Sequence, residues 1–179
     1  MRRILMLLLA IVCLSACAQK VAKEESKNES KKDTNESHLF VGTMDGISAD
    51  KVLTKILDTY RGSTVVVDMW ATWCGPCRMG HQTMVPLKEE MSDKPVKFVY
   101  IAAANSPYDT WREAVANIPG EHYYLTNEQY AYILQNVYNS QGIPTYALYD
   151  ADGNKTWSNV GYMPNNDALR EAINKTLPK

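Results

Sequence analysis

The sequence lacks the features that identify several large classes of protein. Four cysteines in 179 residues are too few for a small fold held together mainly by disulfide bonds. The 19 basic and 20 acidic residues nearly cancel, so the charge gives no reason to expect a nucleic acid as partner. The sequence contains no internal repeat, phosphate-binding glycine loop or HExxH metal motif. What is left is a globular domain in which each cysteine needs its own explanation.

Long apolar runs are also missing, because none reaches the roughly 20 residues of a transmembrane helix. The apolar residues 4–14 follow two arginines, which is typical of a secretory signal peptide. This run leads into Leu14-Ser15-Ala16-Cys17, which resembles the lipobox of bacterial lipoproteins, where the cysteine becomes the lipidated first residue. The pattern predicts that residues 1–16, including Cys13, are removed and that Cys17 is lipidated. The alternative is a plain signal peptide with a chance cysteine.

Residues 18–37 have almost no apolar side chains. They contain five lysines and five acidic residues, and only Val21 is apolar and larger than alanine. Such a segment buries too little surface to offset the entropy lost on ordering. We therefore expect residues 17–37 to be a lipidated cysteine and a disordered tether. A short amphipathic helix is the alternative, but no apolar stripe at helical spacing supports it.

From His38 onward the composition is that of a folded domain. Apolar residues at helical spacing predict helices over residues 48–60, 79–91, 107–118, 127–138 and 167–177. Apolar runs and alternating patterns predict strands over residues 64–70, 96–103, 123–125, 145–149 and 155–160, the last two joined by a tight turn. Strands alternating with helices, followed by a hairpin, indicate an α/β fold with a central mixed β-sheet flanked by helices.

The segment Trp73-Cys74-Gly75-Pro76-Cys77 lies where a buried strand is predicted to give way to a helix. The first turn of a helix directs unpaired N–H groups and a partial positive charge at the first sulfur. This favours the thiolate and lowers the pKa below the usual value of about 8.5. We therefore expect Cys74 to be the more exposed nucleophile. Cys77, one turn deeper, is placed to attack the resulting mixed disulfide and release the partner.

Two other positions add to this motif. Asp68 stands among apolar residues six positions before Cys74, so desolvation should raise its pKa. It could then accept the proton of Cys77 through water as a general base; the alternative is a side chain that points to the surface. Further along the chain, Pro144 stands at the start of a predicted strand. Because proline cannot sit inside a β-ladder, we expect a special turn there, such as a cis peptide bond.

Residues 67–77 resemble the active-site strand and loop of the thioredoxin superfamily, and residues 142–145 are similar to its cis-proline loop. The resemblance implies a thioredoxin-like fold over residues 38–179. By this resemblance Cys74 is the attacking thiol and Cys77 the resolving thiol.

The same resemblance implies that Asp68 is the buried acid and that Pro144 holds the backbone of the substrate. It also implies substrate contacts at the neighbouring residues Trp73, Gly75, Pro76, Ile143 and Thr145. No separate cofactor is expected, because the redox-active Cys74–Cys77 disulfide carries the electrons itself. Trp73 is expected to cover the site, and Trp70 to pack beneath it.

The lipobox together with this domain resembles the TlpA-like, membrane-anchored branch of the superfamily. The resemblance implies extracytoplasmic protein thiols or disulfides as partners, an upstream membrane electron donor, and a domain that faces the periplasm of a bacterial cell envelope. Ala18 after Cys17 favours the outer membrane, by resemblance to lipoprotein sorting rules. The Gly-Pro dipeptide matches thioredoxin, which is a reductant, so we expect a reductase. A protein disulfide oxidase or isomerase with the same residues is the alternative.

His81 follows Cys77 by four residues and shares its helical face. It could complete a copper-delivery site with the two thiolates, but such relatives usually place three residues between their cysteines. We therefore prefer a surface helix histidine and expect no metal site. Gln82 stands where relatives often have a proline that kinks the helix. Because the nearest proline is Pro86, we expect the kink to shift.

Overall fold

The computed structural model describes residues 39–179 of the chain. The predicted signal peptide, the lipidated Cys17 and the tether lie outside the described residues. The described part contains a six-stranded sheet. Its strands are β1 (Leu39–Gly42), β2 (Thr64–Met69), β3 (Val96–Ala103), β4 (Gly120–Leu125), β5 (Thr145–Tyr149) and β6 (Lys155–Val160).

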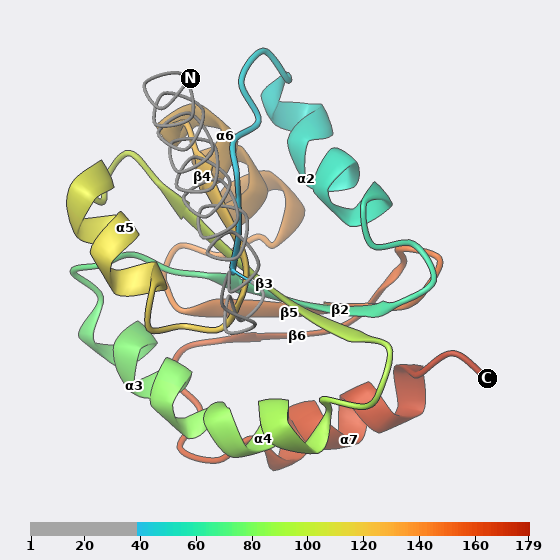
Figure 1. Ribbon diagram of the computed structural model, residues 1–179. Helices are drawn as coiled ribbons and strands as arrows, with labels where there is room; N and C mark the ends of the chain where they lie inside the picture. The colour runs from blue at the N-terminus through green and yellow to red at the C-terminus, as the bar shows by residue number, and fades with distance from the viewer. Residues whose placement is uncertain (1–38) are drawn as a thin grey trace, which may run out of the picture. The chain divides into compact units, whose positions relative to one another are not determined.

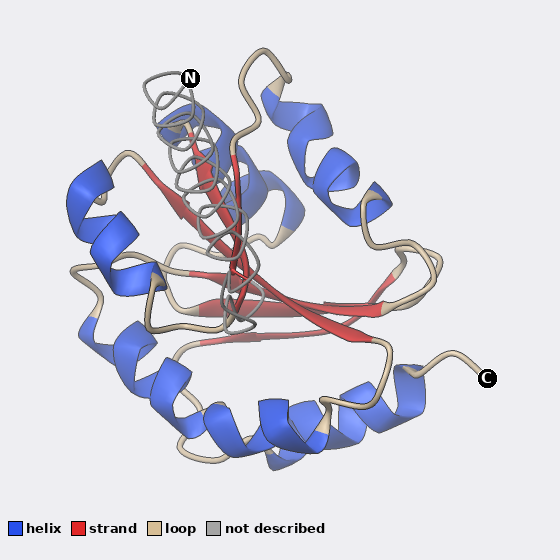
Figure 2. Ribbon diagram, viewed as in Figure 1, coloured by secondary structure: helices blue, strands red, loops and turns tan. Residues whose placement is uncertain are grey.

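The strands follow the spatial order β1-β4-β3-β2-β5-β6. The first four in this order run parallel to one another, whereas β5 is antiparallel to β2 and β6 is antiparallel to β5. Figure 2 shows these strands as one twisted sheet with helices on both sides. The predicted α/β fold with a mixed sheet is therefore confirmed.

Helices cover the two faces of the sheet (Figure 1). They are α2 (Ala49–Asp58), α3 (Gly75–Thr83), α4 (Val85–Glu90), α5 (Tyr108–Val115), α6 (Asn127–Tyr132), which continues into a π-helical turn, η1 (Ile133–Val137), and α7 (Asp167–Thr176). Side chains of α3, α4, α5 and α7 form one apolar cluster with the sheet, and those of α2, α6 and η1 form the other. No helix within residues 39–179 combines the length and the apolar character needed to span a bilayer.

The central strand β2 is buried along its whole length, as its continuous apolar sequence predicts. Its side chains alternate between the two faces. Val65, Val67 and Met69 belong to the cluster beneath α2 and α6. Val66 and Trp70 belong to the opposite cluster, which lies against α3 and α4. Asp68 lies two residues from each of them and so points to the same face of β2, toward the helix that carries the cysteines.

Several elements differ from the prediction. The apolar pattern over residues 79–91 belongs to a helix that begins at Gly75, as the cysteine motif predicts, and that divides into α3 and α4 at Met84. Pro86, in the first turn of α4, lacks the N–H that a continuous helix would use, so the break lies near Pro86 rather than at Gln82. The strand β1 was not predicted. It is only four residues long and pairs with one neighbour, β4, which gives it a weak sequence pattern.

Candidate active site

The two cysteines of the motif form a disulfide at the start of α3, with their Cα atoms 5.3 Å apart. Cys74 is the N-cap residue of the helix, and its Sγ accepts a hydrogen bond of 3.1 Å from the backbone N–H of Cys77. The surface of Cys74 is 4% exposed, whereas Cys77 is fully buried. The helix N-terminus therefore supplies an N–H donor and a partial positive charge to the outer sulfur, as the sequence predicts.

The loop between β2 and α3 is held by the loop that follows β3. The backbone N–H of Thr72 donates to Oγ of Ser106 at 3.0 Å, and the indole N–H of Trp73 donates to the carbonyl of Asn105 at 3.2 Å. Trp73 nevertheless keeps 61% of its surface exposed beside the disulfide, whereas Trp70 is buried, as expected. This arrangement offers an aromatic surface next to the outer sulfur.

The loop before β5 approaches the disulfide from the other side. The peptide bond between Ile143 and Pro144 is cis, as the sequence predicts. The carbonyl oxygen of Ile143 lies 3.8 Å from Sγ of Cys74. The fully buried Thr145 donates its hydroxyl to the carbonyl of Gly142 at 2.6 Å and contacts Oγ of Ser140 at 2.8 Å. The side chain of Thr145 therefore shapes this loop from inside; Pro144 is buried as well, and Ile143 is partly exposed.

Asp68 lies in the core against His81 of α3 and is 1% exposed, as predicted for a buried acid. Its carboxyl is fixed by the pairing of β2 with both β3 and β5. Burial raises the pKa of Asp68, and the nearby His81 and Lys88 oppose that rise. The carboxyl therefore has the environment of a proton acceptor that holds its proton more tightly than an exposed aspartate does.

His81 is not a surface histidine, so this prediction was wrong. The residue is 8% exposed, and its Nε2 lies 3.1 Å from Oδ2 of Asp68. The imidazole ring packs edge-on against Trp70 and Tyr100, with ring centroids 4.9 Å and 5.2 Å away. Its position follows from the helix itself, because His81 shares the inward face of α3 with Cys77.

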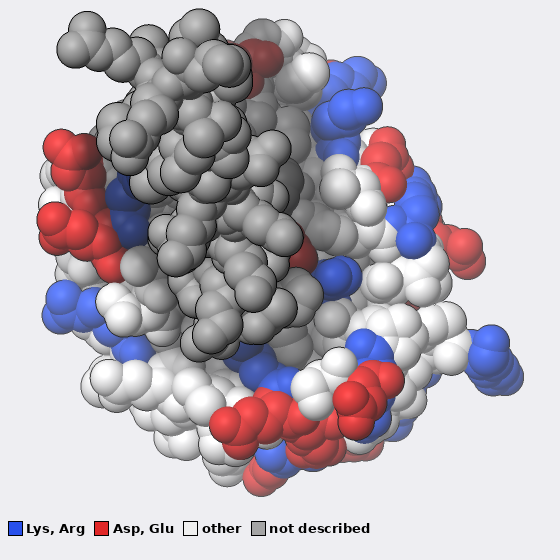
Figure 3. Space-filling model, in the orientation of Figure 1, with Lys and Arg blue, Asp and Glu red and all other residues white. Residues whose placement is uncertain are grey.

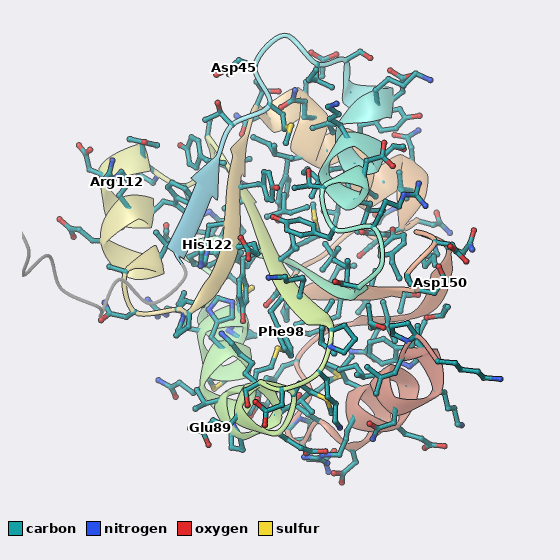
Figure 4. All side chains as sticks on the ribbon, turned by 45° about the vertical axis from the view of Figure 1, so that its right-hand side comes forward. Asp45, Glu89, Phe98, Arg112, His122 and Asp150 are labelled. Carbon is teal, nitrogen blue, oxygen red and sulfur yellow. A yellow bond between two sulfur atoms is a disulfide. The ribbon has the colours of Figure 1, made fainter. Side chains whose placement is uncertain are left out.

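Two other basic side chains lie near this pair. Lys88 donates from Nζ to the hydroxyl of Tyr100 at 3.2 Å and to the carbonyl of Pro119, and burial lowers its pKa to about 8. His122 lies on β4 (Figure 4) and is fully buried, with its ring stacked on Tyr100 at 4.9 Å. Burial lowers the pKa of His122 to about 4, so this ring is neutral at physiological pH. Neither residue was predicted to lie near the site.

Within residues 39–179 no three His, Cys, Asp or Glu side chains gather closely enough to hold a metal ion. The copper-delivery alternative needs Cys74, Cys77 and His81 as ligands, and it receives no support from this arrangement. The face of the molecule in Figure 3 has basic and acidic side chains interspersed.

Three comparisons place the chain among known proteins. A sequence profile of the Redoxin family matches residues 42–174. Thioredoxin of Bacillus subtilis (strain 168) is 31% identical over 113 residues, which cover 63% of this chain and 82% of that protein. A thiol:disulfide interchange protein DsbE of Chlorobium tepidum is 28% identical in a structural match with a TM-score of 0.56, covering 68% of this chain and 85% of that one.

A second solved structure supports the fold. It is a thiol:disulfide interchange protein of the thioredoxin family from Chlorobium tepidum TLS, 24% identical with a TM-score of 0.58, and the match covers 68% of this chain and 84% of that one. The Redoxin profile spans well over half of the chain and includes both cysteines and the cis-proline loop. The chain therefore belongs to the Redoxin family of the thioredoxin superfamily, as a thioredoxin-like thiol–disulfide oxidoreductase.

Proposed function

We propose that this oxidoreductase is a lipid-anchored protein disulfide reductase of a bacterial cell envelope. The observation that carries the proposal is the position of Cys74 Sγ, which lies between the N-terminus of α3 and the cis-proline loop. A thiolate there is stabilised by the helix and lies beside a backbone edge that a partner chain can reach.

The proposed reaction moves two electrons from the cysteine pair to a partner disulfide. The thiolate of Cys74 attacks one sulfur of the partner, and the other partner sulfur leaves as a thiolate that takes up a proton. Cys77 then loses its proton, and its sulfur attacks Cys74, which breaks the mixed disulfide and releases the second partner sulfur. The pair ends as the Cys74–Cys77 disulfide, and a membrane electron donor returns it to the dithiol.

Asp68 has the proposed role of accepting the proton of Cys77 through a water molecule. This role is supported by the burial of the carboxyl against α3, the helix that carries the cysteines, and by its pKa, which burial raises. Pro144 has the proposed role of positioning the partner backbone. The proposed partner surface consists of the residues around the outer sulfur, namely Trp73, Gly75, Pro76, Ile143 and the backbone of Thr145.

The direction of electron flow is proposed from the residues between the cysteines. Gly75 and Pro76 match thioredoxin, with a potential of about −270 mV, whereas strong oxidants of the superfamily lie near −120 mV. The likeness to thioredoxin of Bacillus subtilis supports the same direction. A potential near the oxidant value would instead favour the oxidase or isomerase alternative.

The location and the partners are proposed from the sequence before the domain and from one solved relative. The lipobox-like segment around Cys17 supports a lipid anchor, and Ala18 favours the outer membrane. The Chlorobium tepidum relative is named a thiol:disulfide interchange protein, which supports protein thiols and disulfides as the substrates here. We propose that the domain faces the periplasm and acts on cysteine pairs of extracytoplasmic proteins.

The proposal is tested with two cysteine variants in cells. Cys77→Ser should trap partner proteins as mixed disulfides with Cys74, because the resolving thiol is missing, and the trapped proteins can be identified by mass spectrometry. Cys74→Ser, the matched control, should trap nothing and should lose insulin reduction. Insulin reduction that survives in Cys74→Ser would show that the nucleophile is assigned wrongly.

A further inference from the structure

Asp68 needs a way to pass on the proton that it is proposed to accept. Both of its oxygens are buried, and among the described residues neither has a hydrogen-bond partner of good geometry. The one ion-pair contact of the carboxyl within residues 39–179 is His81, at 3.1 Å. A buried carboxyl with one ion-pair partner can exchange protons with solvent through that partner or through the site itself, which a docked partner protein covers.

His81 connects this buried carboxyl to the surface. A pocket of about 380 Å³ opens among α3, α4 and the segment from α5 to β4, and His81 lies in its wall together with Arg78, Lys88 and Asn117. Asp68 does not line this pocket. The imidazole therefore separates the carboxyl from the pocket, and it is held in place by the edge-on contacts with Trp70 and Tyr100.

We propose that His81 is a positioning residue that transfers protons between Asp68 and the solvent in this pocket, so that Cys77 can be deprotonated while a partner protein covers the disulfide. The proposal rests on the proposed role of Asp68 and adds the route by which the proton leaves. The pocket lies beside α3 and α5, and none of its lining residues belongs to the cis-proline loop.

The proton balance of the step is simple. Cys77 gives its proton to the pair formed by Asp68 and His81, which adds one positive charge to the pair, and the thiolate of Cys77 attacks Cys74. The imidazole then gives one proton to pocket water, and the pair returns to its starting charge.

The other titratable groups that face the pair are less suited to this transfer. Burial raises the pKa of Tyr100 on β3, Tyr130 on α6 and Tyr146 on β5, so these phenols keep their protons at neutral pH. His122 on β4 is neutral because burial lowers its pKa to about 4. Lys88 on α4, with a pKa of about 8, is the one competing group, and its Nζ is bound to Tyr100 and to the carbonyl of Pro119.

The test isolates the step in which Cys77 resolves the mixed disulfide. The reduced full-length protein is mixed with oxidised glutathione, and tryptophan fluorescence is followed in a stopped-flow instrument. At high glutathione disulfide the rate reaches a limit set by the attack of Cys77 on Cys74. We expect His81→Gln and His81→Ala to lower this limiting rate by about 10²-fold, the usual contribution of a positioned acid–base group. We also expect both variants to alter its pH profile.

Chemical rescue separates proton transfer from packing. Added imidazole should accelerate His81→Ala in proportion to its concentration, because the small base can enter the pocket next to the vacated site, and it should leave the wild-type limiting rate unchanged. Lys88→Met is the matched control, because it removes the one lysine that lines the pocket. It should not produce a loss that imidazole restores. The thermal unfolding of each variant shows that it is folded.

The outcomes distinguish this inference from the proposed function. If Asp68→Asn leaves the limiting rate unchanged, the proposed role of Asp68 is wrong. If Asp68→Asn slows the step but the His81 variants do not, the carboxyl acts alone and the proton route proposed here is wrong. A loss in His81→Ala with an unchanged pH profile and no response to imidazole would show that the ring only packs. An imidazole-sensitive loss in Lys88→Met would assign the route to the lysine.

Discussion

The buried carboxyl of Asp68 makes the folding of the protein depend on pH. Its pKa is raised in the folded state because burial penalises the charged form, whereas an unfolded chain has the ordinary value of 3.8. Between these two values the folded state binds a proton that the unfolded state has lost. Stability therefore falls as the pH rises from about 3.8 through the folded pKa.

We predict that Asp68→Asn stabilises the oxidised protein at neutral pH. Asparagine has the same shape but no charge to desolvate, so the gain in unfolding free energy should be largest at neutral pH and should shrink toward pH of about 4. Urea unfolding of the two proteins across this range measures the difference. A variant that is less stable than the wild type at neutral pH would mean that the contact with His81 outweighs the desolvation of the carboxyl.

For the residues of the site, the sequence predicts the chemical role better than it predicts which side chains come into contact. Asp68 could be predicted to be buried because the residues next to it on the strand, Val65 to Val67 and Met69, are apolar. The burial of His81 was missed, although its spacing from Cys77 contains the signal: if the inner sulfur is buried, so is the residue one turn later. Lys88 and His122 could not be predicted to lie near the site, because that depends on how α4 and β4 pack against β3.

At the scale of the elements, Gly80 of α3 lies against the side chain of Tyr146 on β5. A Cβ atom added at Gly80 would fall too close to the hydroxyl of Tyr146, a fully buried side chain of β5. This hydroxyl has no hydrogen-bond partner among the described residues, and the aromatic ring that carries it is rigid. The glycine therefore sets the distance between the cysteine-bearing helix and the strand that follows the cis-proline loop.

We predict that Gly80→Ala destabilises the protein by about 1 to 2 kcal/mol. Overpacking costs about 1 to 3 kcal/mol, and the higher helix propensity of alanine returns up to about 1 kcal/mol. Chemical denaturation of the oxidised protein measures the change. Gly75→Ala in the same helix is the control, because a Cβ there meets no atom within 4 Å and should leave stability unchanged within about 1 kcal/mol. Equal effects in both variants would contradict the close approach.

Several elements were predicted closely, including the hairpin strands β5 and β6, whose bounds match the prediction. The buried strands β2 and β3 and the final helix α7 were predicted nearly residue for residue. The strand β4 begins at Gly120, earlier than expected, because its first residues, Gly-Glu-His, do not resemble a strand in isolation. These residues form a strand because β1 pairs with one edge of the segment and β3 with the other.

At the scale of the whole molecule, the domain is one part of a longer chain whose first residues are proposed to fix it to a membrane. We predict that the intact mass of the protein purified from the membrane fraction corresponds to loss of residues 1–16 and a lipid on Cys17. In Cys17→Ser the lipid should be absent and the first 16 residues retained, because processing of a lipoprotein needs the modified cysteine. Reduction of oxidised glutathione by the purified variant should be unchanged.

A chain that is cleaved but has an unmodified Cys17 would support the plain signal peptide instead. The oxidoreductase activity would stand in either case, because the cysteines that perform it lie in the Redoxin match at residues 42–174.

The parallel pairing of β1 has a mechanical consequence for an anchored protein. Strands β1, β4, β3 and β2 run in the same direction, so Leu39, where the chain enters the sheet, lies at the amino ends of these strands, whereas Cys74 follows the carboxyl end of β2. The proposed tether therefore joins the domain at the amino ends of these strands, and the disulfide lies beyond the opposite, carboxyl end of β2. A force applied through the tether along β1 would act parallel to the strands and would shear the β1–β4 hydrogen bonds together. The force would enter the sheet at the end opposite to the catalytic loop.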